Sequence, residues 1–245
     1  VCWFEFDRSM QASAGDLDNL LKFFSGTGEA KLVVLDEIVF VPNWQDVLKR
    51  HYDLSNTKFI VTGSSALELD KRSSESLAGR FEIIKVKPFS FAENLLLTTG
   101  TSPKNQFELV KKSGEMQNKC NEYLKTGGLP EAIPLDNERR RGFVKNSILE
   151  PLFFKDIPGV FPNANPDLLL KTLELLSGTV GSTFQFQQMT EVLGCSHPVI
   201  ATQVEILCKS LVVSQLFNYT PSIIKQKRTA KKIIFTDNGI LNILN

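Results

Sequence analysis

Short apolar runs alternate with one-faced helical patterns over the first ninety residues of the chain. The apolar runs lie at residues 1–7, 32–35, 59–61 and 81–86. Between the first and second runs, and again between the second and third, apolar or aromatic residues recur at the spacing of an amphipathic helix. These residues are Leu17, Leu20, Leu21, Phe24, Trp44, Val47, Leu48 and either His51 or Tyr52. Strands joined by such crossover helices are typical of one parallel sheet, so we predict an α/β fold.

The rest of the chain has mostly helical patterns and ends in a strand pair. A polar stretch at 98–118 predicts a loop followed by a helix, and residues 123–131 predict a turn-rich hinge. Helices are then predicted at 167–176, 186–193 and 196–211, and strands at 212–217 and 232–235. A helix, a helix-turn-helix and a hairpin follow one another in this order in a winged helix.

These patterns divide the chain into three regions. We predict an α/β core at 1–97, a helical linker or lid region at 98–165 and a winged-helix domain at 166–245. The first apolar run begins at Val1, with no initiator Met and no element before it, so we expect the sequence to be a fragment of a longer chain.

Composition narrows the classes of function. The chain has 245 residues, of which 42% are hydrophobic and 22% charged, which is typical of a globular protein. A net charge of +1 argues against a protein that coats nucleic acid or an anionic membrane with its whole surface. The four cysteines form no CxxC pair, and only two histidines are present, so neither a zinc site nor a disulfide scaffold is predicted. Because no apolar stretch approaches the ~18 residues of a membrane span, we expect a cytoplasmic protein without membrane contact.

A pair of carboxylates follows the second apolar run. Asp36 and Glu37 come directly after Leu35, at the end of a strand expected to be buried. Phosphoryl transfer needs one carboxylate to hold Mg²⁺ and another to orient or deprotonate the attacking water. Adjacent side chains of an extended chain point in opposite directions, so one carboxylate could face the metal and the other the water. The alternative is that both are ordinary acidic residues at a turn.

Two further elements could complete such a site. The next strand is followed by Thr62, Ser64 and Ser65, whose hydroxyls would lie at the same edge of the sheet and could contact the γ-phosphate or the attacking water. Arg80, which precedes the fourth apolar run, could reach phosphate charge in its own or a neighbouring subunit. The alternatives are a helix cap at Ser64 or Ser65 and a solvated Arg80.

Together these segments resemble the prokaryotic AAA-type ATP-binding proteins that carry a C-terminal domain of unknown function. The resemblance covers nearly the whole chain. It rests on Leu35-Asp36-Glu37-Ile38, Val41-Pro42-Asn43-Trp44, Thr62-Gly63-Ser64-Ser65, Leu77-Ala78-Gly79-Arg80, Pro88-Phe89-Ser90-Phe91, residues 123–131 and residues 234–241.

The resemblance implies a P-loop NTPase-like parallel sheet and assigns roles to individual residues. It implies ATP and Mg²⁺ as cofactors, Asp36 as the Mg²⁺ ligand and Glu37 as the catalytic base. Ser64 or a neighbouring hydroxyl would act as the phosphate sensor, Thr62 would contribute to the nucleotide site, and Arg80 would sense phosphate.

The sequence departs from the family pattern in two places. Val39 stands where members usually have Gln, which removes a polar contact from that loop. No Gly-x-x-x-x-Gly-Lys-Ser/Thr loop occurs, although that loop supplies the amides and the Lys that hold the β- and γ-phosphates. In the family the loop and its strand precede a segment like residues 1–7, and the strand lies centrally in the sheet. We therefore expect a gap, or another segment, between the strand near Ser64 and the strand near Phe81; direct pairing of those two strands would contradict an ATPase.

The linker between the last two strands is basic. Lys225, Lys227, Arg228, Lys231 and Lys232 could lie on DNA phosphates, with helix 196–211 in the major groove. That helix offers no Arg to read guanine, so a solvated hairpin or a protein-contact surface is an equal alternative. The basic run Arg139 to Arg141 is expected to be a solvated helix face.

The leading hypothesis is an ATP-binding, Mg²⁺-dependent ATPase whose nucleotide state is coupled to the winged helix. Hydrolysis would depend on a P-loop outside these residues, and we expect the 245 residues alone not to hydrolyse ATP. The alternative is a non-enzymatic DNA- or protein-binding regulator with a vestigial nucleotide site. A homo-oligomer or another protein partner is compatible with either.

Overall fold

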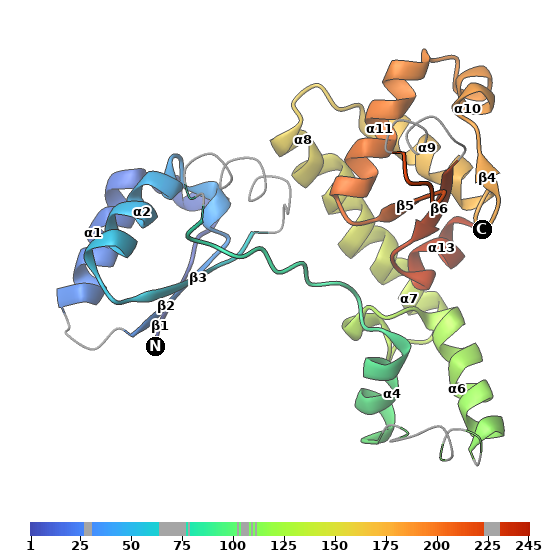
Figure 1. Cartoon of the computed structure of the whole chain (residues 1–245), viewed down its shortest axis with the longest axis horizontal. Helices are drawn as coiled ribbons and strands as arrows, with labels where there is room; N and C mark the ends of the chain where they lie inside the picture. The colour runs from blue at the N-terminus through green and yellow to red at the C-terminus, as the bar shows by residue number, and fades with distance from the viewer. Residues whose placement is uncertain are drawn as a thin grey trace. The chain divides into compact units, whose positions relative to one another are not determined.

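The computed structural model describes residues 1–26, 31–63, 77, 79–101, 103, 108, 110, 112–222 and 231–245. The chain divides into two compact units, residues 1–85 and 86–245. Figure 1 labels the elements of both. Among the described residues, no helix is long and apolar enough to cross a membrane.

The N-terminal unit is built on a parallel sheet of three strands in the order β1-β2-β3. The strands are β1 (Cys2–Glu5), β2 (Leu32–Asp36) and β3 (Lys58–Val61). Helix α1 (Ala14–Gly26) connects the first two strands and α2 (Trp44–Leu54) the next two, with short 3-10 turns η1 (Arg8–Met10) and η2 (Ile38–Phe40) near the strand ends. The three strands and two crossover helices predicted from the apolar pattern are therefore confirmed.

The two faces of this sheet differ in burial. Both helices lie on one face (Figure 1), where Val33 and Leu35 of β2 form a core with apolar side chains of α1 and α2. On the other face, Trp3, Val34 and Ile60 are neighbours across the three strands. Trp3 is 58% exposed and Ile60 50% exposed. A parallel sheet is usually covered on both faces. Here the described helices of the unit, α1 and α2, both lie on the opposite face, so these apolar side chains are exposed among the described residues.

The prediction of a fourth strand at residues 81–86 is wrong. Residues 81–86 are extended but pair with no described strand, and four of their apolar side chains are exposed. These are Phe81, Ile83, Ile84 and Val86. Periodicity alone does not make a strand, because its backbone N–H and C=O groups need a neighbouring strand. Because residues 81–86 form no strand, the expected gap between this predicted strand and the strand near Ser64 is not tested by the described residues.

The C-terminal unit begins with two helices, α4 (Phe91–Thr99) and α6 (Ser113–Thr126). Ser90 caps α4 in a capping box with Glu93, whose side chain accepts from the Ser90 backbone N–H at 2.8 Å. The predicted hinge at 123–131 is partly wrong, because its first residues form the last turn of α6. Gly127, with a φ of 78°, is the C-cap of α6, and the 3-10 turn η3 (Pro130–Ala132) follows.

A long helical stretch with two wide-turn segments follows. It consists of α7 (Asn137–Phe143), the π-helices η4 (Val144–Leu149) and η5 (Leu152–Asp156), and α8 (Ile157–Val160). The two π segments lie on either side of Glu150 and Pro151. Proline lacks an N–H and its ring crowds the carbonyl four residues earlier, so a local change of hydrogen-bond pattern is the physical response expected there.

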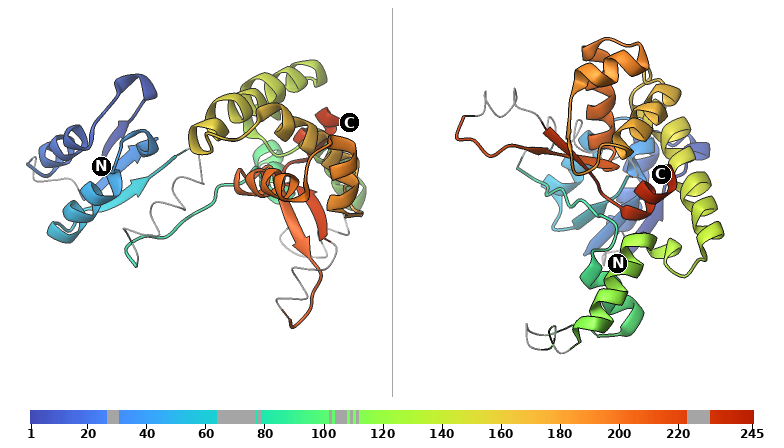
Figure 2. Two further views of the ribbon diagram at one scale, coloured as in Figure 1. Left: turned by 90° about the horizontal axis from the view of Figure 1, so that it is seen from above. Right: turned by 90° about the vertical axis from the view of Figure 1, so that its right-hand side faces the viewer.

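The last part of the unit packs three helices on a small antiparallel sheet. The helices are α9 (Pro166–Ser177), α10 (Phe186–Leu193) and α11 (His197–Lys209). Strands β4 (Thr183–Phe184), β5 (Val213–Phe217) and β6 (Lys231–Phe235) form the sheet in the order β4-β6-β5, and α13 (Asn238–Leu244) follows. The paired strands β5 and β6 extend from the helices in both views of Figure 2. The helices and strands predicted in this region are confirmed within a few residues.

Candidate functional site

Asp36 and Thr62 meet where β2 and β3 end. The two strands are parallel neighbours, so their carboxyl ends lie at the same edge of the sheet. The Thr62 hydroxyl donates a hydrogen bond to Oδ1 of Asp36. The same hydroxyl oxygen accepts the backbone N–H of Glu37 at 3.1 Å. One threonine therefore holds both the carboxylate of Asp36 and the backbone of the following residue.

The backbone around this pair is fixed by the strand ladder. The Thr62 N–H donates to the Leu35 carbonyl at 3.0 Å, and the Ile38 N–H donates to the Thr62 carbonyl at 3.1 Å. The Asp36 carbonyl also accepts the Phe6 N–H at 2.9 Å, which ties in the end of β1. All three strands thus contribute to the position of Asp36.

Glu37 does not continue the strand. Its φ of 53° lies in the left-handed region, which is uncommon for residues other than glycine. The expected arrangement, in which Asp36 and Glu37 alternate along an extended chain, is therefore wrong, because the chain turns sharply at Glu37 into η2. The turn buries Ile38 and Val39 against the core. An apolar residue at position 39 fits this environment.

Arg80, another predicted site residue, is not brought to this group. Arg80 donates from Nε to Oδ1 of Asp53 at 3.0 Å, in the last turn of α2. This ion pair is half-exposed. Ser64 lies outside the described residues. Of the residues predicted from the sequence, Asp36, Glu37 and Thr62 form one local group.

The chemistry of this group fits a magnesium ion held together with a nucleotide. Carboxylate and hydroxyl oxygens are the hard donors that Mg²⁺ prefers, and Mg²⁺ usually takes one or two carboxylates, several waters and substrate phosphates. No cluster of three His, Cys, Asp or Glu side chains occurs among the described residues. The described residues thus offer part of a coordination shell, which suits a metal that arrives with phosphate ligands.

A second group of residues, which sequence reasoning did not single out as a unit, centres on Asp237. Its buried carboxylate accepts the Gly128 N–H at 2.6 Å and the Ile240 N–H at 3.2 Å, which caps α13. Gly128 also accepts the Phe89 N–H through its carbonyl at 2.8 Å, and the Tyr123 hydroxyl donates to the Phe89 carbonyl at 2.8 Å. Three segments that carried the family resemblance therefore meet here.

This second group is structural. An added Cβ at Gly127 would lie 2.4 Å from Asp237 Oδ1, and one at Gly239 would lie 2.7 Å from the Thr126 carbonyl oxygen. Burial, with the charge of Asp237 nearby, raises the pKa of Tyr123 above its ordinary value. The sequence signal was the joint presence of Gly-Gly and Asp-x-Gly, which marks close backbone approach rather than catalysis.

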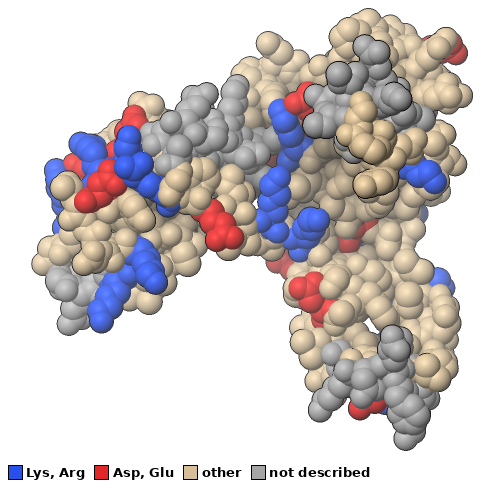
Figure 3. Space-filling view, in the orientation of Figure 1, with Lys and Arg blue, Asp and Glu red and all other residues tan. Residues whose placement is uncertain are grey.

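The two described lysines of the predicted basic linker differ. Lys231 places Nζ 5.6 Å from the ring centroid of Phe186 and 5.2 Å from that of Phe217, so its charge is held between aromatic faces. Lys232, the next residue of β6, is exposed. Lys225, Lys227 and Arg228 lie outside the described residues. On the face drawn in Figure 3, basic and acidic side chains both occur in each unit.

Comparison with known proteins assigns both parts of the chain. Residues 1–95 match a family described as an AAA domain. Residues 117–245, more than half of the chain, match a domain of unknown function, DUF8612. The chain has no match among solved structures.

Several curated proteins are similar over most of the chain. An uncharacterized protein of Methanocaldococcus jannaschii, MJ1637, is 30% identical over 224 residues, which is 84% of this chain and 46% of that protein. An uncharacterized protein of Haemophilus influenzae is 25% identical over 241 residues, or 96% of this chain and 58% of that protein. The chain thus spans about half the length of the relatives it matches. With an AAA domain at its N-terminal end, the chain belongs to the protein family defined by DUF8612.

Proposed function

We propose that the chain is part of an ATP-binding, Mg²⁺-dependent ATPase in which Asp36, Glu37 and Thr62 form the metal and water side of the active site. The observation that carries this proposal is the double use of the Thr62 hydroxyl. It binds the carboxylate of Asp36 and the backbone N–H of Glu37 at the carboxyl edge of the sheet. The match of residues 1–95 to an AAA domain supports the same activity.

Each of the three residues has a separate role in this proposal. Thr62 is a positioning residue, because its hydroxyl fixes one oxygen of Asp36 and leaves the other to accept from a metal-bound water or to ligate the metal. Glu37 orients a water and accepts its proton. Bound Mg²⁺ and ATP would supply the charge neutralisation and the phosphoryl group. The phosphate-holding loop of such enzymes has no counterpart in these 245 residues, so the proposal covers half of the active site.

We also propose that residues 166–245 form a winged helix that responds to nucleotide state. The order α9, β4, α10, α11, β5, β6 and the central place of β6 in the sheet support this assignment. The buried Asp237 gives the preceding hinge a direct link to this region, because it binds Gly128 and caps α13. A movement of α6 and the hinge would therefore shift Asp237 and with it the N-terminal end of α13.

The test of the catalytic assignment is ATP turnover by the full-length protein. Glu37→Gln is expected to lower kcat about a hundredfold or more with little change in nucleotide affinity, since removing a general base affects the chemical step. Glu82→Gln is the matched control, because Glu82 is an exposed carboxylate of the same unit with no ion pair among the described residues. Unchanged turnover in Glu37→Gln would remove Glu37 from the role of base.

The alternative function, a DNA-binding regulator, has one supporting observation, the exposed Lys232 on β6. If the hairpin lies on DNA, Lys232→Gln should weaken binding to duplex DNA and reduce the salt dependence by about one charge. Lys231→Gln should act mainly on stability, because its ammonium group is held by two phenylalanine rings. Fluorescence anisotropy at two salt concentrations measures the DNA affinity and its salt dependence. An affinity that is the same in the wild-type chain and in Lys232→Gln would argue against the alternative.

A further inference from the structure

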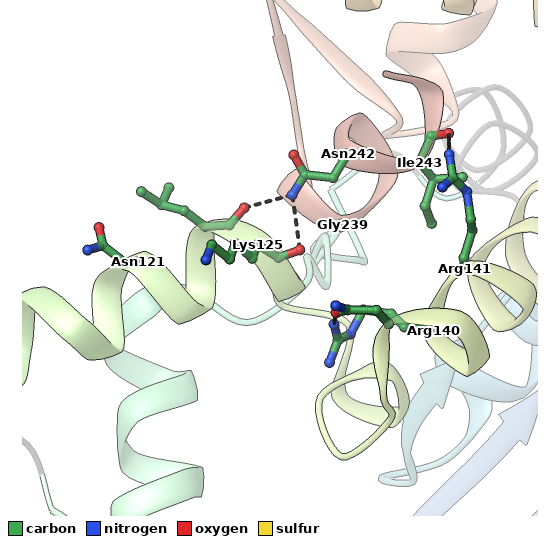
Figure 4. Close-up of a pocket in the computed structure, with 9 residues that line it drawn as sticks. Asn121, Lys125, Arg140, Arg141, Gly239, Asn242 and Ile243 are labelled. Atoms are coloured by element: carbon green, nitrogen blue, oxygen red, sulfur yellow. Dashed lines mark hydrogen bonds between the residues drawn. The ribbon is translucent and has the colours of Figure 1, made fainter.

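An open pocket in the C-terminal unit is lined by three basic side chains and, among the described residues, by no carboxylate. It lies where α6, α7 and α13 meet and has a volume of about 630 Å³ (Figure 4). Ligand sites for small molecules are commonly of ~300–1,000 Å³. The basic residues are Lys125 from the last turn of α6 and Arg140 and Arg141 from α7.

The three positive charges are not neutralised within the described structure. Arg140 donates to the Ala132 carbonyl at 3.1 Å, to Asn137 Oδ1 at 3.0 Å and to the Leu135 carbonyl. Arg141 donates to the Ile243 carbonyl at 3.3 Å. These partners are uncharged, and no ion pair among the described residues includes Lys125, Arg140 or Arg141. Lys125 and Arg141 are exposed and Arg140 is half-buried, so the pocket carries a net positive charge at an open surface.

The solvated basic face expected for residues 139–141 holds for Arg139 and Arg141, which are exposed, whereas Arg140 is half-buried. Arg139 fits that expectation, because it is exposed and lies 3.5 Å from Asp136. Arg140 and Arg141 also donate to backbone carbonyls and line the pocket (Figure 4).

The end of helix α6 beside the pocket is partly capped by a side chain from α13. Its last carbonyls carry partial negative charge, which would oppose an anion. The side-chain amide of Asn242 donates to the Leu124 carbonyl at 2.8 Å and to the Lys125 carbonyl at 3.0 Å. These two acceptors are therefore already occupied, and the lining offers mainly donors and cations.

We propose that this pocket binds a small ligand that carries two or more phosphate groups. Lys125 comes from α6 and Arg140 and Arg141 from α7, so the cations reach the pocket from two elements (Figure 4). A phosphate group carries about −1.5 to −2 charges at neutral pH, so two such groups balance three cations better than two carboxylates do. The planar guanidinium groups suit phosphate oxygens.

The test is calorimetric titration of the 245-residue chain with inorganic tripolyphosphate in buffer without Mg²⁺. Lys125→Gln and Arg141→Gln are each expected to weaken binding about tenfold, the effect of one charge-assisted hydrogen bond. Arg139→Gln is the matched control, because it removes a neighbouring charge outside the pocket and should leave the affinity unchanged. Arg140 is left intact, since it also holds two carbonyls that the fold needs.

Two further arms separate this proposal from the ATPase site and from other anions. Asp36→Asn should not change tripolyphosphate binding, so failure of the ATPase proposal and failure of this one can be told apart. Citrate should bind at least tenfold more weakly than tripolyphosphate. No measurable binding, equal binding of citrate, or equal losses in Arg139→Gln and Arg141→Gln would each overturn the proposal.

Discussion

At the scale of single residues, Gly128 shows how closely two backbones approach in the C-terminal unit. It is buried, and a Cβ added there would lie 2.0 Å from the Phe89 carbonyl oxygen and 2.9 Å from the Phe89 nitrogen. Both contacts are with backbone, which cannot rotate away as a side chain can. The hydrogen bond from Phe89 N–H to the Gly128 carbonyl, at 2.8 Å, would have to change.

Gly128→Ala is therefore expected to destabilise the C-terminal unit by roughly 1–3 kcal/mol or more, the cost of overpacking a closed site. Urea unfolding followed by circular dichroism measures the change. Gly142→Ala is the matched control: position 142 lies in α7 and has no atom within 4 Å of an added Cβ, so Ala there should be neutral or stabilising. Equal stability of the Gly128 and Gly142 variants would contradict the close approach.

At the scale of elements, Asp18 joins the two helices of the N-terminal unit. Its carboxylate on α1 lies 2.7 Å from Lys22 Nζ on the same helix and 2.9 Å from His51 Nε2 on α2, with Arg50 at 3.7 Å. The hydrogen bonds from Lys22 and His51 lower the pKa of Asp18 from 3.8 to about 2. The charged form is thus favoured in the folded state.

The sign of the pH dependence follows from this lowered pKa. A carboxyl group whose pKa is lower when folded contributes stability above its unfolded pKa, and that contribution is lost as the pH falls through the folded value. The N-terminal unit should therefore lose stability between pH 3.8 and about 2. Thermal unfolding of the wild-type chain and of Asp18→Asn across that range checks this, because the variant should show the smaller pH dependence. Parallel curves for the two proteins would contradict the prediction.

The periodicity of apolar residues predicted helices and strands well where the element buries one of its faces. Helix 186–193 and the strand at 32–35 agree with α10 and β2 because their apolar residues face a core within the same unit. The periodicity failed at 81–86, where apolar residues recur but no described strand lies beside them.

At the candidate site, the sequence indicated Asp36 and Thr62, because the ends of parallel strands meet at one edge of a sheet. It could not indicate the Asp53 partner of Arg80, since that contact depends on the path of a chain segment without periodic signal.

At the scale of the whole molecule, the two units have separate cores. The buried apolar cluster of the N-terminal unit is formed by residues from Phe6 to Leu77 of the sequence. The cluster of the C-terminal unit is formed by residues from Ala132 to Ile240. The boundary at residue 85 falls within the extended segment that follows Arg80.

We therefore expect two unfolding transitions in calorimetry rather than one, because each core can be lost without the other. Asp18→Asn should move only the transition of the N-terminal unit, and Gly128→Ala only that of the C-terminal unit. A fragment of residues 86–245 should unfold at the same temperature as the corresponding transition of the whole chain. A single transition shifted by both variants would show that the units unfold together.

The exposed Trp3 on the parallel sheet can report on this face by its fluorescence. The chain has two tryptophans, and Trp44 is buried in the core whereas Trp3 is exposed beside Val34 and Ile60. Indole emission shifts to shorter wavelength when water is excluded from the ring. Whatever covers this face should therefore blue-shift the Trp3 component of the fluorescence and protect it from iodide quenching, while the Trp44 component stays constant as an internal reference.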